Sequence, residues 1–233
     1  MKDRSPGCSP KLLNGTPDAA QIVRKINSLE LWFNMPLHKT QEVLFIVALK
    51  EELPRNLLPE FNIEYCGVGK INATYKALEI ISKYEPKLII NFGTAGSLRK
   101  NLFGLHEVSH FFQRDMDARA LGFKIGVTPF EERSVIDFGR TGLSCSSGDN
   151  FVSSPPELKT DLVDMEAYAI AKVCVLKNVQ FMCFKYVSDN ADENASKNWK
   201  ANASLGATAF KDMIKNLDLQ TMLGLREKEQ HEN

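Results

Sequence analysis

The sequence contains few cysteines, no long apolar run and no excess of charge of either sign. Its five cysteines, at positions 8, 66, 145, 174 and 183, are odd in number and widely spaced, and its four histidines show no metal-ligand spacing. We therefore expect free thiols in a reducing, cytoplasmic setting, without disulfides or a bound metal. No apolar segment approaches the length of a membrane-spanning helix, and none near residue 1 has the form of a signal-peptide core.

The balance of charge argues against proteins that bind polyanions. Lys and Arg number 29, as do Asp and Glu, so the sequence offers no basic surface for a nucleic acid or a membrane. Apolar residues make up 43% of the 233 positions and charged residues 25%. These values are typical of one soluble domain with a continuous core.

The chain divides into three predicted parts. Residues 1–40 form an extension, with a polar start and one helix that begins at Thr16-Pro17 and carries apolar residues at helical spacing from position 22 to position 33. Residues 41–217 form the main α/β domain, in which we find neither repeats nor a linker. Residues 218–233 form a charged tail.

Strands and helices alternate in the first half of the main domain. Apolar runs at residues 43–49 and 88–92 predict buried strands, and residues 62–66 predict another. Residues 71–84 carry a helical apolar stripe that Pro86 closes. A strand, a helix and a strand with a glycine-rich exit are typical of a parallel α/β unit.

The second half continues this pattern. Residues 106–112, 143–147 and 181–187 are predicted strands, residues 122–126 a short extended segment, and residues 128–142 a loop. Helices are predicted over residues 165–177 and 198–216. The residues expected to face the core are Ile71, Ala77, Leu78 and Ile81 in the first helix, Ala167, Ile170, Ala171, Cys174 and Val175 in the second, and Leu205, Ala209, Phe210, Met213 and Ile214 in the last.

Polar and glycine-rich groups collect where the predicted strands end. Glu51-Glu52 and Ser188-Asp189 follow two of these strands, and residues 93–96 and 148–151 are glycine-rich exits. Ligands of open α/β sheets bind beyond the carboxyl ends of the strands. Two separate acids at that edge suit acid–base chemistry, in which one protonates a leaving group and the other activates water. Taken alone, Ser188-Asp189 is more typical of a helix N-cap. Together, the four strand ends predict a two-acid hydrolase or transferase with a small polar substrate.

Seven short motifs in a fixed order make the interpretation more specific. They are ALKEE at residues 48–52, GVGK at 67–70, NFGTAG at 91–96, DMD at 115–117, SGDNF at 147–151, VDMEA at 163–167 and VSDNAD at 187–192. Over residues 43–215 the sequence resembles the nucleoside phosphorylase/nucleosidase superfamily, and within it the 5′-methylthioadenosine/S-adenosylhomocysteine nucleosidase branch. The resemblance implies a single α/β domain, with a central mixed, twisted sheet in a three-layer α/β/α arrangement. It also implies a homodimer that hydrolyses the N-glycosidic bond of a 5′-substituted adenosine and uses no metal or organic cofactor.

The resemblance also implies roles for individual residues. Asp189 would protonate the purine at N7, and Ser188 would help to hold its carboxyl group. Glu52 would polarise the attacking water, and Glu166 would bind the ribose hydroxyls and favour a cationic sugar. The other implied substrate contacts are Met165 under the ribose, Phe151 stacked on the base, Val152 at the adenine edge, Thr94 near the water and the ribose, and Leu49 and Trp199 around the 5′ substituent.

Other interpretations stay open at this stage. Glu51, Glu52 and Glu166 could be solvated charges, and Phe151 and Trp199 could be ordinary core residues. An acid at position 52 favours water over phosphate as the nucleophile, whereas Lys50 and Arg114 leave a phosphate-dependent purine nucleoside phosphorylase possible.

A nonenzymatic nucleoside-binding protein is the third hypothesis. It is motivated by short segments at residues 130–144 and 151–161 and by the extra helix predicted within residues 1–40. Arg114, where the resembled family commonly has a histidine, is a further departure. Residues 1–40 have no counterpart in that family. One hypothesis is that their helix covers the surface that the shortening exposes.

Overall fold

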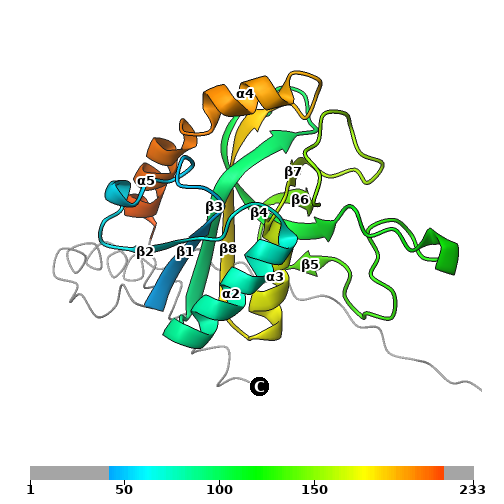
Figure 1. Cartoon of the computed structure of the whole chain (residues 1–233), viewed down its shortest axis with the longest axis horizontal. Helices are drawn as coiled ribbons and strands as arrows, with labels where there is room; N and C mark the ends of the chain where they lie inside the picture. The colour runs from blue at the N-terminus through cyan, green and yellow to red at the C-terminus, as the bar shows by residue number, and fades with distance from the viewer. Residues whose placement is uncertain (1–41, 218–233) are drawn as a thin grey trace, which may run out of the picture. The chain divides into compact units, whose positions relative to one another are not determined.

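Strand β1 (Val43–Val47) is the apolar run that the sequence predicts, and all five of its residues are buried. It opens the part of the chain that the computed structural model describes, residues 42–217 (Figure 1). The predictions made for residues 1–40 and 218–233, including the helix and its covering role, lie outside the described residues.

The strands form one mixed sheet. β1 pairs in parallel with β2 (Asn62–Tyr65) and with β3 (Leu88–Ser97). β3 pairs in parallel with β8 (Gln180–Asp189) and antiparallel with β7 (Leu162–Asp164). β4 (Gly104–Gln113) pairs in parallel with β6 (Leu143–Ser147) and antiparallel with β8 and β5 (Ile136–Asp137). Because β6 also pairs with β7, the strands β3, β7, β6, β4 and β8 close a circuit of pairings, from which β1 and β2 extend.

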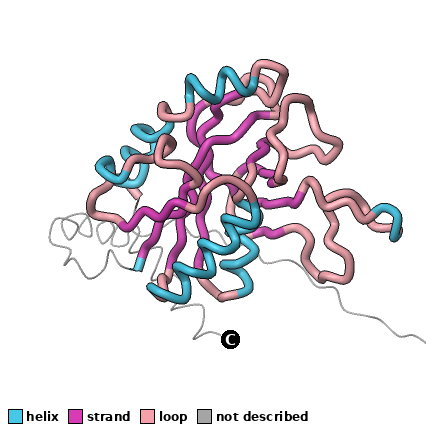
Figure 2. Tube along the Cα trace, viewed as in Figure 1, coloured by secondary structure: helices cyan, strands magenta, loops and turns pink. Residues whose placement is uncertain are grey.

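Helices flank this sheet, as Figure 2 shows. α2 (Lys70–Tyr84) and α3 (Ala167–Leu176) pack against each other, while α4 (Ala195–Asn202) and α5 (Gly206–Asn216) follow β8 along the other side of the molecule in Figure 1. Two 3₁₀ turns lie at Arg55–Leu57 and Arg119–Leu121. The predicted fold class, a mixed sheet flanked by helices, is confirmed. None of the helices described within residues 42–217 is long and apolar enough to cross a membrane.

All three predicted helix faces are partly wrong. In α2 the buried residues are Ala73, Ala77 and Ile80, whereas Ile71 is 81% exposed. Small side chains on the buried face let α2 approach α3 closely, so the largest apolar residues of the stripe point outward. In α3 the predicted inward residues are buried except Val175, which is 41% exposed.

The predicted helix over residues 198–216 is two helices. The break falls at residues 203–205, and it leaves Leu205 exposed. A Cβ at Gly206 would lie 2.5 Å from the side chain of Tyr186 in β8, so the start of α5 needs glycine there. Phe210 and Ile214 are buried as predicted, while Ala209 is exposed. The Phe210 ring stacks on Phe92 with centroids 4.2 Å apart, which fixes α5 against the sheet.

Strands β3 and β8 are longer than predicted, and this decides where the chemistry lies. β3 continues through the glycine-rich residues 93–96, and β8 continues through Ser188 to Asp189. Their register changes between Ala95, which pairs with Val187, and Gly96, which pairs with Asp189. The extra residue, Ser188, makes a β-bulge, a device that redirects side chains beside many active sites. The segment predicted as extended, residues 122–126, contains no strand.

Candidate active site

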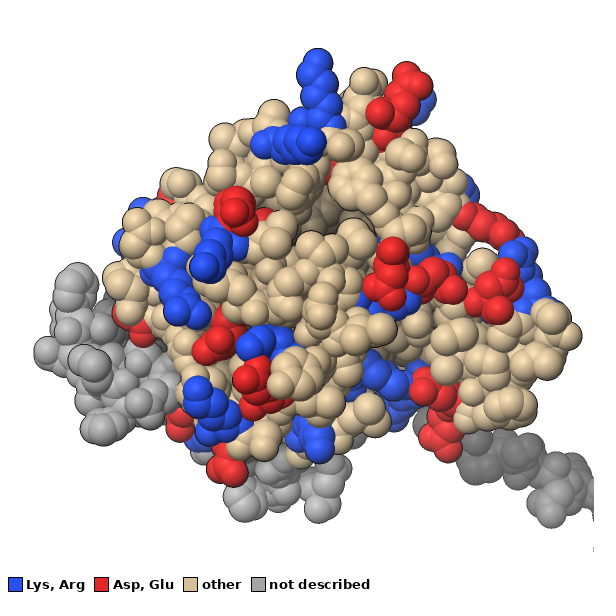
Figure 3. Space-filling model, in the orientation of Figure 1, with Lys and Arg blue, Asp and Glu red and all other residues tan. Residues whose placement is uncertain are grey.

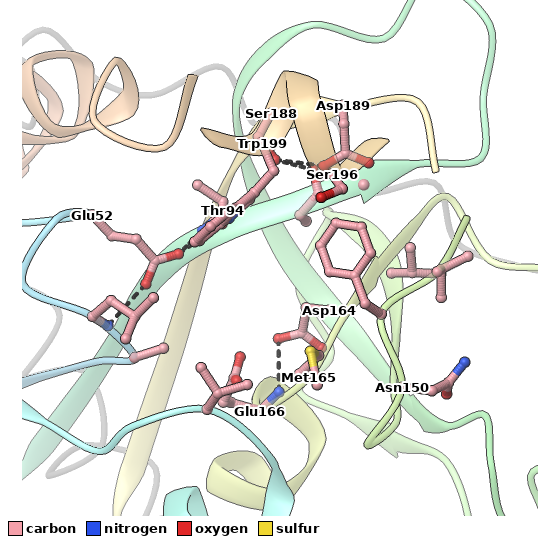
Figure 4. Close-up of a pocket in the computed structure, with 18 of the residues that line it drawn as sticks. Glu52, Thr94, Asn150, Asp164, Met165, Glu166, Ser188, Asp189, Ser196 and Trp199 are labelled. Atoms are coloured by element: carbon pink, nitrogen blue, oxygen red, sulfur yellow. Dashed lines mark hydrogen bonds between the residues drawn. The ribbon is translucent and has the colours of Figure 1, made fainter. Parts of the chain in front are cut away.

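A cavity of about 260 Å³ opens beyond the ends of β1, β3 and β8, under α4 (Figures 3 and 4). All ten residues that the sequence predicts as site residues line it. They are Leu49, Glu52, Thr94, Phe151, Val152, Met165, Glu166, Ser188, Asp189 and Trp199. The structure therefore brings together side chains that are up to 150 positions apart in the sequence.

Asp189 is the last residue of β8 and is buried, with 8% of its surface exposed. Its carboxylate accepts hydrogen bonds from the hydroxyl of Ser188 at 2.8 Å and from the backbone N–H of Ala191 at 2.9 Å. Burial raises the pKa of Asp189, and these two bonds oppose that rise without cancelling it. An acid of this kind is suited to hold and deliver a proton.

The N-cap interpretation of Ser188-Asp189 is wrong. α4 begins at Ala195, six positions after Asp189, and Asn194 occupies its N-cap. Asp189 instead bonds the backbone two residues along, as in an Asx turn. Gly96 allows this arrangement, because a Cβ there would lie 2.8 Å from Asp189 Oδ1. The helix terminus that would have lowered the pKa of Asp189 is therefore displaced from it.

Glu52 lies just after β1 and is 3% exposed, so it is not a solvated charge. Its Oε1 accepts hydrogen bonds from the backbone N–H of Thr94 at 2.8 Å and from the Thr94 hydroxyl at 2.7 Å, while Oε2 accepts one from the N–H of Leu49 at 3.1 Å. The indole N–H of Trp199 donates to the same Thr94 hydroxyl at 2.9 Å. Figure 4 shows this chain of contacts from α4 to the end of β1. Glu52 is thus held in one orientation at the edge of the cavity.

Glu166 stands across the cavity from Asp189 in Figure 4 and is 7% exposed, so it is not a surface residue of α3. Its Oε1 accepts a hydrogen bond of 2.9 Å from the N–H of Gly69, the residue that precedes α2. Burial, and next the charge of Asp164, raise the pKa of Glu166 to about 7, against the opposing effect of Lys185.

An ion pair beneath the cavity was not predicted from the sequence. Lys185, in the middle of β8, is 1% exposed, and its Nζ lies 2.8 Å from Asp164 Oδ2. Burial alone would lower the pKa of Lys185, but Asp164, together with the nearby Cys183, Glu166 and Cys145, raises that pKa above its usual value. Asp164 also accepts hydrogen bonds from the Ser147 hydroxyl and from the N–H of Ala167. The lysine inside the apolar run 181–187 indicates such a pair, because an unpaired charge in a buried strand would be costly.

Arg114 lines the cavity, but its guanidinium group donates hydrogen bonds to the protein backbone. Its guanidinium donates to the carbonyl oxygens of residues Ser146, Gly148, Asn150 and Asp164, at 2.5–3.2 Å. A Cβ at Gly148 would lie 3.0 Å from the Arg114 side chain, so the loop needs glycine there. Arg114 therefore fixes the segment that leads from β6 to Phe151.

The apolar walls of the cavity differ in exposure. Val152 is 8% exposed, Met165 is half-buried, and the Phe151 ring is 46% exposed, so it is not a core residue. Such a ring offers a face to a planar ligand. Among the residues that the structure describes, no group of His, Cys, Asp and Glu side chains is arranged to hold a metal ion.

Comparison with known sequences gives a consistent set of relatives. A family model described as the phosphorylase superfamily matches residues 140–217. The 5′-methylthioadenosine/S-adenosylhomocysteine nucleosidase of Staphylococcus haemolyticus is 30% identical over 177 residues, which cover 65% of this chain and 78% of that protein. The protein of the same name from Shewanella piezotolerans is 30% identical over 159 residues, covering 56% and 68%.

Solved structures share the fold. The futalosine hydrolase of Helicobacter pylori superposes with a TM-score of 0.70 at 22% identity, covering 76% of this chain and 97% of that one. The 5′-methylthioadenosine/S-adenosylhomocysteine nucleosidase of the same bacterium, complexed with a pyrrolidine-based ligand, superposes with a TM-score of 0.66 at 21% identity, covering 76% and 99%.

Proposed function

Since this chain belongs to the 5′-methylthioadenosine/S-adenosylhomocysteine nucleosidase family of the phosphorylase superfamily, we propose that it hydrolyses the N-glycosidic bond of 5′-substituted adenosines and releases adenine. One observation carries the proposal: three buried carboxylates, Asp189, Glu52 and Glu166, face one cavity from three sides. Their surroundings differ, and each fits a different step of the reaction.

Asp189 is the proton donor in this proposal. It gives its proton to N7 of the adenine as the C1′–N9 bond breaks, and the electron pair of that bond leaves with the base. The raised pKa of Asp189 favours the protonated form that this step needs. Phe151 packs on the base, and the backbone at Val152 reads its edge.

Glu52 and Glu166 act on the sugar. The bond breaks through an oxocarbenium-like transition state, which nearby negative charge stabilises. Glu166 binds the ribose hydroxyls, and Glu52, held by Thr94, accepts a proton from the water that adds to C1′. The products are adenine and a free 5-substituted ribose.

Water suits this site better than phosphate as the nucleophile. Both NH₂ groups of Arg114 already donate to carbonyl oxygens, and Lys50 is exposed and does not line the cavity. Lys185 is paired with Asp164. Lys200 also lines the cavity, but it is exposed at the rim. The buried Glu52 and Glu166 would therefore repel a phosphate dianion placed beside the sugar.

The test is incubation of the purified chain with 5′-methylthioadenosine, S-adenosylhomocysteine, adenosine and inosine, with and without phosphate. We expect adenine release at the same rate in both buffers, fastest from the 5′-thio substrates, with free ribose derivatives as co-products. Phosphate-dependent formation of a ribose 1-phosphate would establish a phosphorylase instead. Binding of adenine without turnover of any substrate would establish a nonenzymatic binding protein.

The outer face of α2 and α3 supports a homodimer. A groove of about 660 Å³ runs between the two helices, and three of its apolar residues are strongly exposed: Ile71 at 81%, Tyr75 at 68% and Leu176 at 71%. Contiguous exposed apolar surface of this kind marks protein interfaces. A second copy of the chain is the proposed partner, and it would also brace Gly69, which holds Glu166.

We expect light scattering to give twice the mass of the 26.2 kDa chain, and Tyr75→Glu to shift it to the mass of one chain. An unmodified protein that runs as a single chain would contradict the dimer.

We also propose a cytoplasmic location, because the described cysteines Cys66, Cys145, Cys174 and Cys183 are all free thiols. Recovery of the protein from a secreted or periplasmic fraction would contradict it.

A further inference from the structure

Lys200 is the cationic side chain at the cavity whose charge the protein leaves unused. The other cation that lines the cavity, Arg114, donates to backbone carbonyls. Lys200 forms no ion pair or side-chain hydrogen bond with any residue of the described range 42–217, and it is exposed at the rim. Figure 3, in the orientation of Figure 1, shows Lys and Arg side chains over α4 next to a hollow in this face.

The helix that carries Lys200 is firmly held. Ala195 at its start is fully buried, and Trp199 Nε1 bonds Thr94. Just beyond Lys200, the Asn202 side-chain amide donates to the carbonyl oxygen of Ser188 at 2.9 Å. These contacts tie α4 to both β3 and β8. The Lys200 backbone is therefore fixed relative to the catalytic acids, and only its side chain is free to move.

Ser196 and Lys200 stand one helical turn apart, so they share a face of α4. Both line the cavity, together with Trp199 between them. Trp199 bonds Thr94, which in turn bonds Glu52, and these two residues mark the sugar end of the site, while Asp189 marks the base end. A group on the 5′ carbon that passes Trp199 toward solvent therefore reaches a hydroxyl and an ammonium group.

From this geometry we propose that Lys200, with Ser196, binds a carboxylate at the far end of the 5′ substituent. The inference rests on the proposed function and narrows its substrate class. A methylthio group ends in a methyl and offers nothing to an ammonium, whereas a homocysteinyl group ends in an α-amino acid whose carboxylate can pair with Lys200. The site thereby favours 5′-substituted adenosines whose tail carries a carboxylate over those with a neutral alkylthio group.

The test compares S-adenosylhomocysteine with 5′-methylthioadenosine in Lys200→Met and in a matched control. Methionine keeps the apolar stem and removes the charge. We expect Lys200→Met to lower kcat/KM for S-adenosylhomocysteine about fivefold, as for an ion pair near the surface, mainly through KM. For 5′-methylthioadenosine we expect a change below about twofold. Lys200→Arg should keep the preference, because it keeps the charge. Lys197→Met is the control, since Lys197 is an exposed lysine of the same helix that does not line the cavity.

Calorimetric binding of the same two nucleosides separates this inference from the proposed function. A ratio of the two Kd values that Lys200→Met leaves unchanged, or an equal loss for both nucleosides, would overturn the role of Lys200. If the unmodified chain binds both but cleaves neither, hydrolysis is refuted, and the Kd ratio still decides whether Lys200 recognises the carboxylate.

Discussion

Asp189→Asn is expected to lower kcat for 5′-methylthioadenosine by about 10²- to 10⁴-fold, the range that positioned proton transfer contributes in enzymes. Asparagine has no acidic proton, so adenine would have to leave as an anion. Its side-chain oxygen can still accept the bond from the Ala191 N–H, and its NH₂ group can donate to the Ser188 hydroxyl oxygen in place of the bond that Asp189 accepts. We therefore expect the fold and the substrate Kd to change little, while adenine release at saturating substrate nearly stops.

Asp192→Asn is the matched control. Asp192 lies three residues further on and caps the N–H of Asn194 at 2.9 Å, but it does not line the cavity. We expect its kcat to stay within about twofold of the unmodified chain, because no proton passes through it. Full activity of Asp189→Asn would remove Asp189 from the mechanism. An equal loss in both variants would show that the geometry of the turn, rather than the acid, controls the rate.

Much of this site could be predicted because apolar runs indicate buried strands, and the polar residues that follow them mark where the strands end. Glu52 and Asp189 follow such runs, and the structure places both beside the same cavity. The sequence could not show how those ends meet. The circuit of β3, β7, β6, β4 and β8 includes antiparallel pairings, which depend on contacts between distant segments. Local sequence patterns do not reveal these contacts between distant segments.

The errors in the helices have a common physical cause. The size of an apolar side chain predicts burial only where neighbouring elements leave room for it. In α2, Ala73 and Ala77 face α3 because close packing favours small residues, and Ile71 is left outside. At Gly206, where α5 begins, the side chain of Tyr186 leaves no room for a Cβ. Both outcomes depend on the partner surface, which periodicity does not reveal.

The buried ion pair of Lys185 was not predicted, although the sequence around Lys185 itself contained a sign of it. A strand with buried neighbours on both sides holds a lysine only when a counter-charge lies within reach. Asp164 supplies it from β7, a strand of only three residues that gives a weak pattern of its own. The sequence alone indicates that Lys185 needs a counter-charge, but only the structure identifies Asp164 as that partner.

The ion pair of Lys185 and Asp164 leads to the second large prediction. Lys185→Met should lower the free energy of unfolding by about 3–5 kcal/mol, the cost of leaving one member of a buried pair without its partner. Methionine nearly matches lysine in length, so the loss comes from the charge and not from a cavity. Urea denaturation at neutral pH measures it. The exposed pair of Arg119 with Asp117 provides the control, and Arg119→Met should cost less than about 1 kcal/mol.

A second substitution tests whether the unpaired charge is the cause. Adding Asp164→Asn to Lys185→Met removes that charge, keeps one oxygen for the Ala167 N–H and places an NH₂ group that can donate to the Ser147 hydroxyl oxygen. The double variant should therefore be more stable than Lys185→Met alone.

The ion pair also affects the reaction, because Lys185 opposes the rise in the pKa of Glu166 and Asp164 promotes it. In Lys185→Met the pH at which activity sets in should move upward from about 7, since Glu166 must ionise to accept the ribose hydroxyls. A stability loss with no shift in that profile would confine the pair to folding. An unchanged free energy of unfolding would show that Asp164 finds another partner when Lys185 is gone.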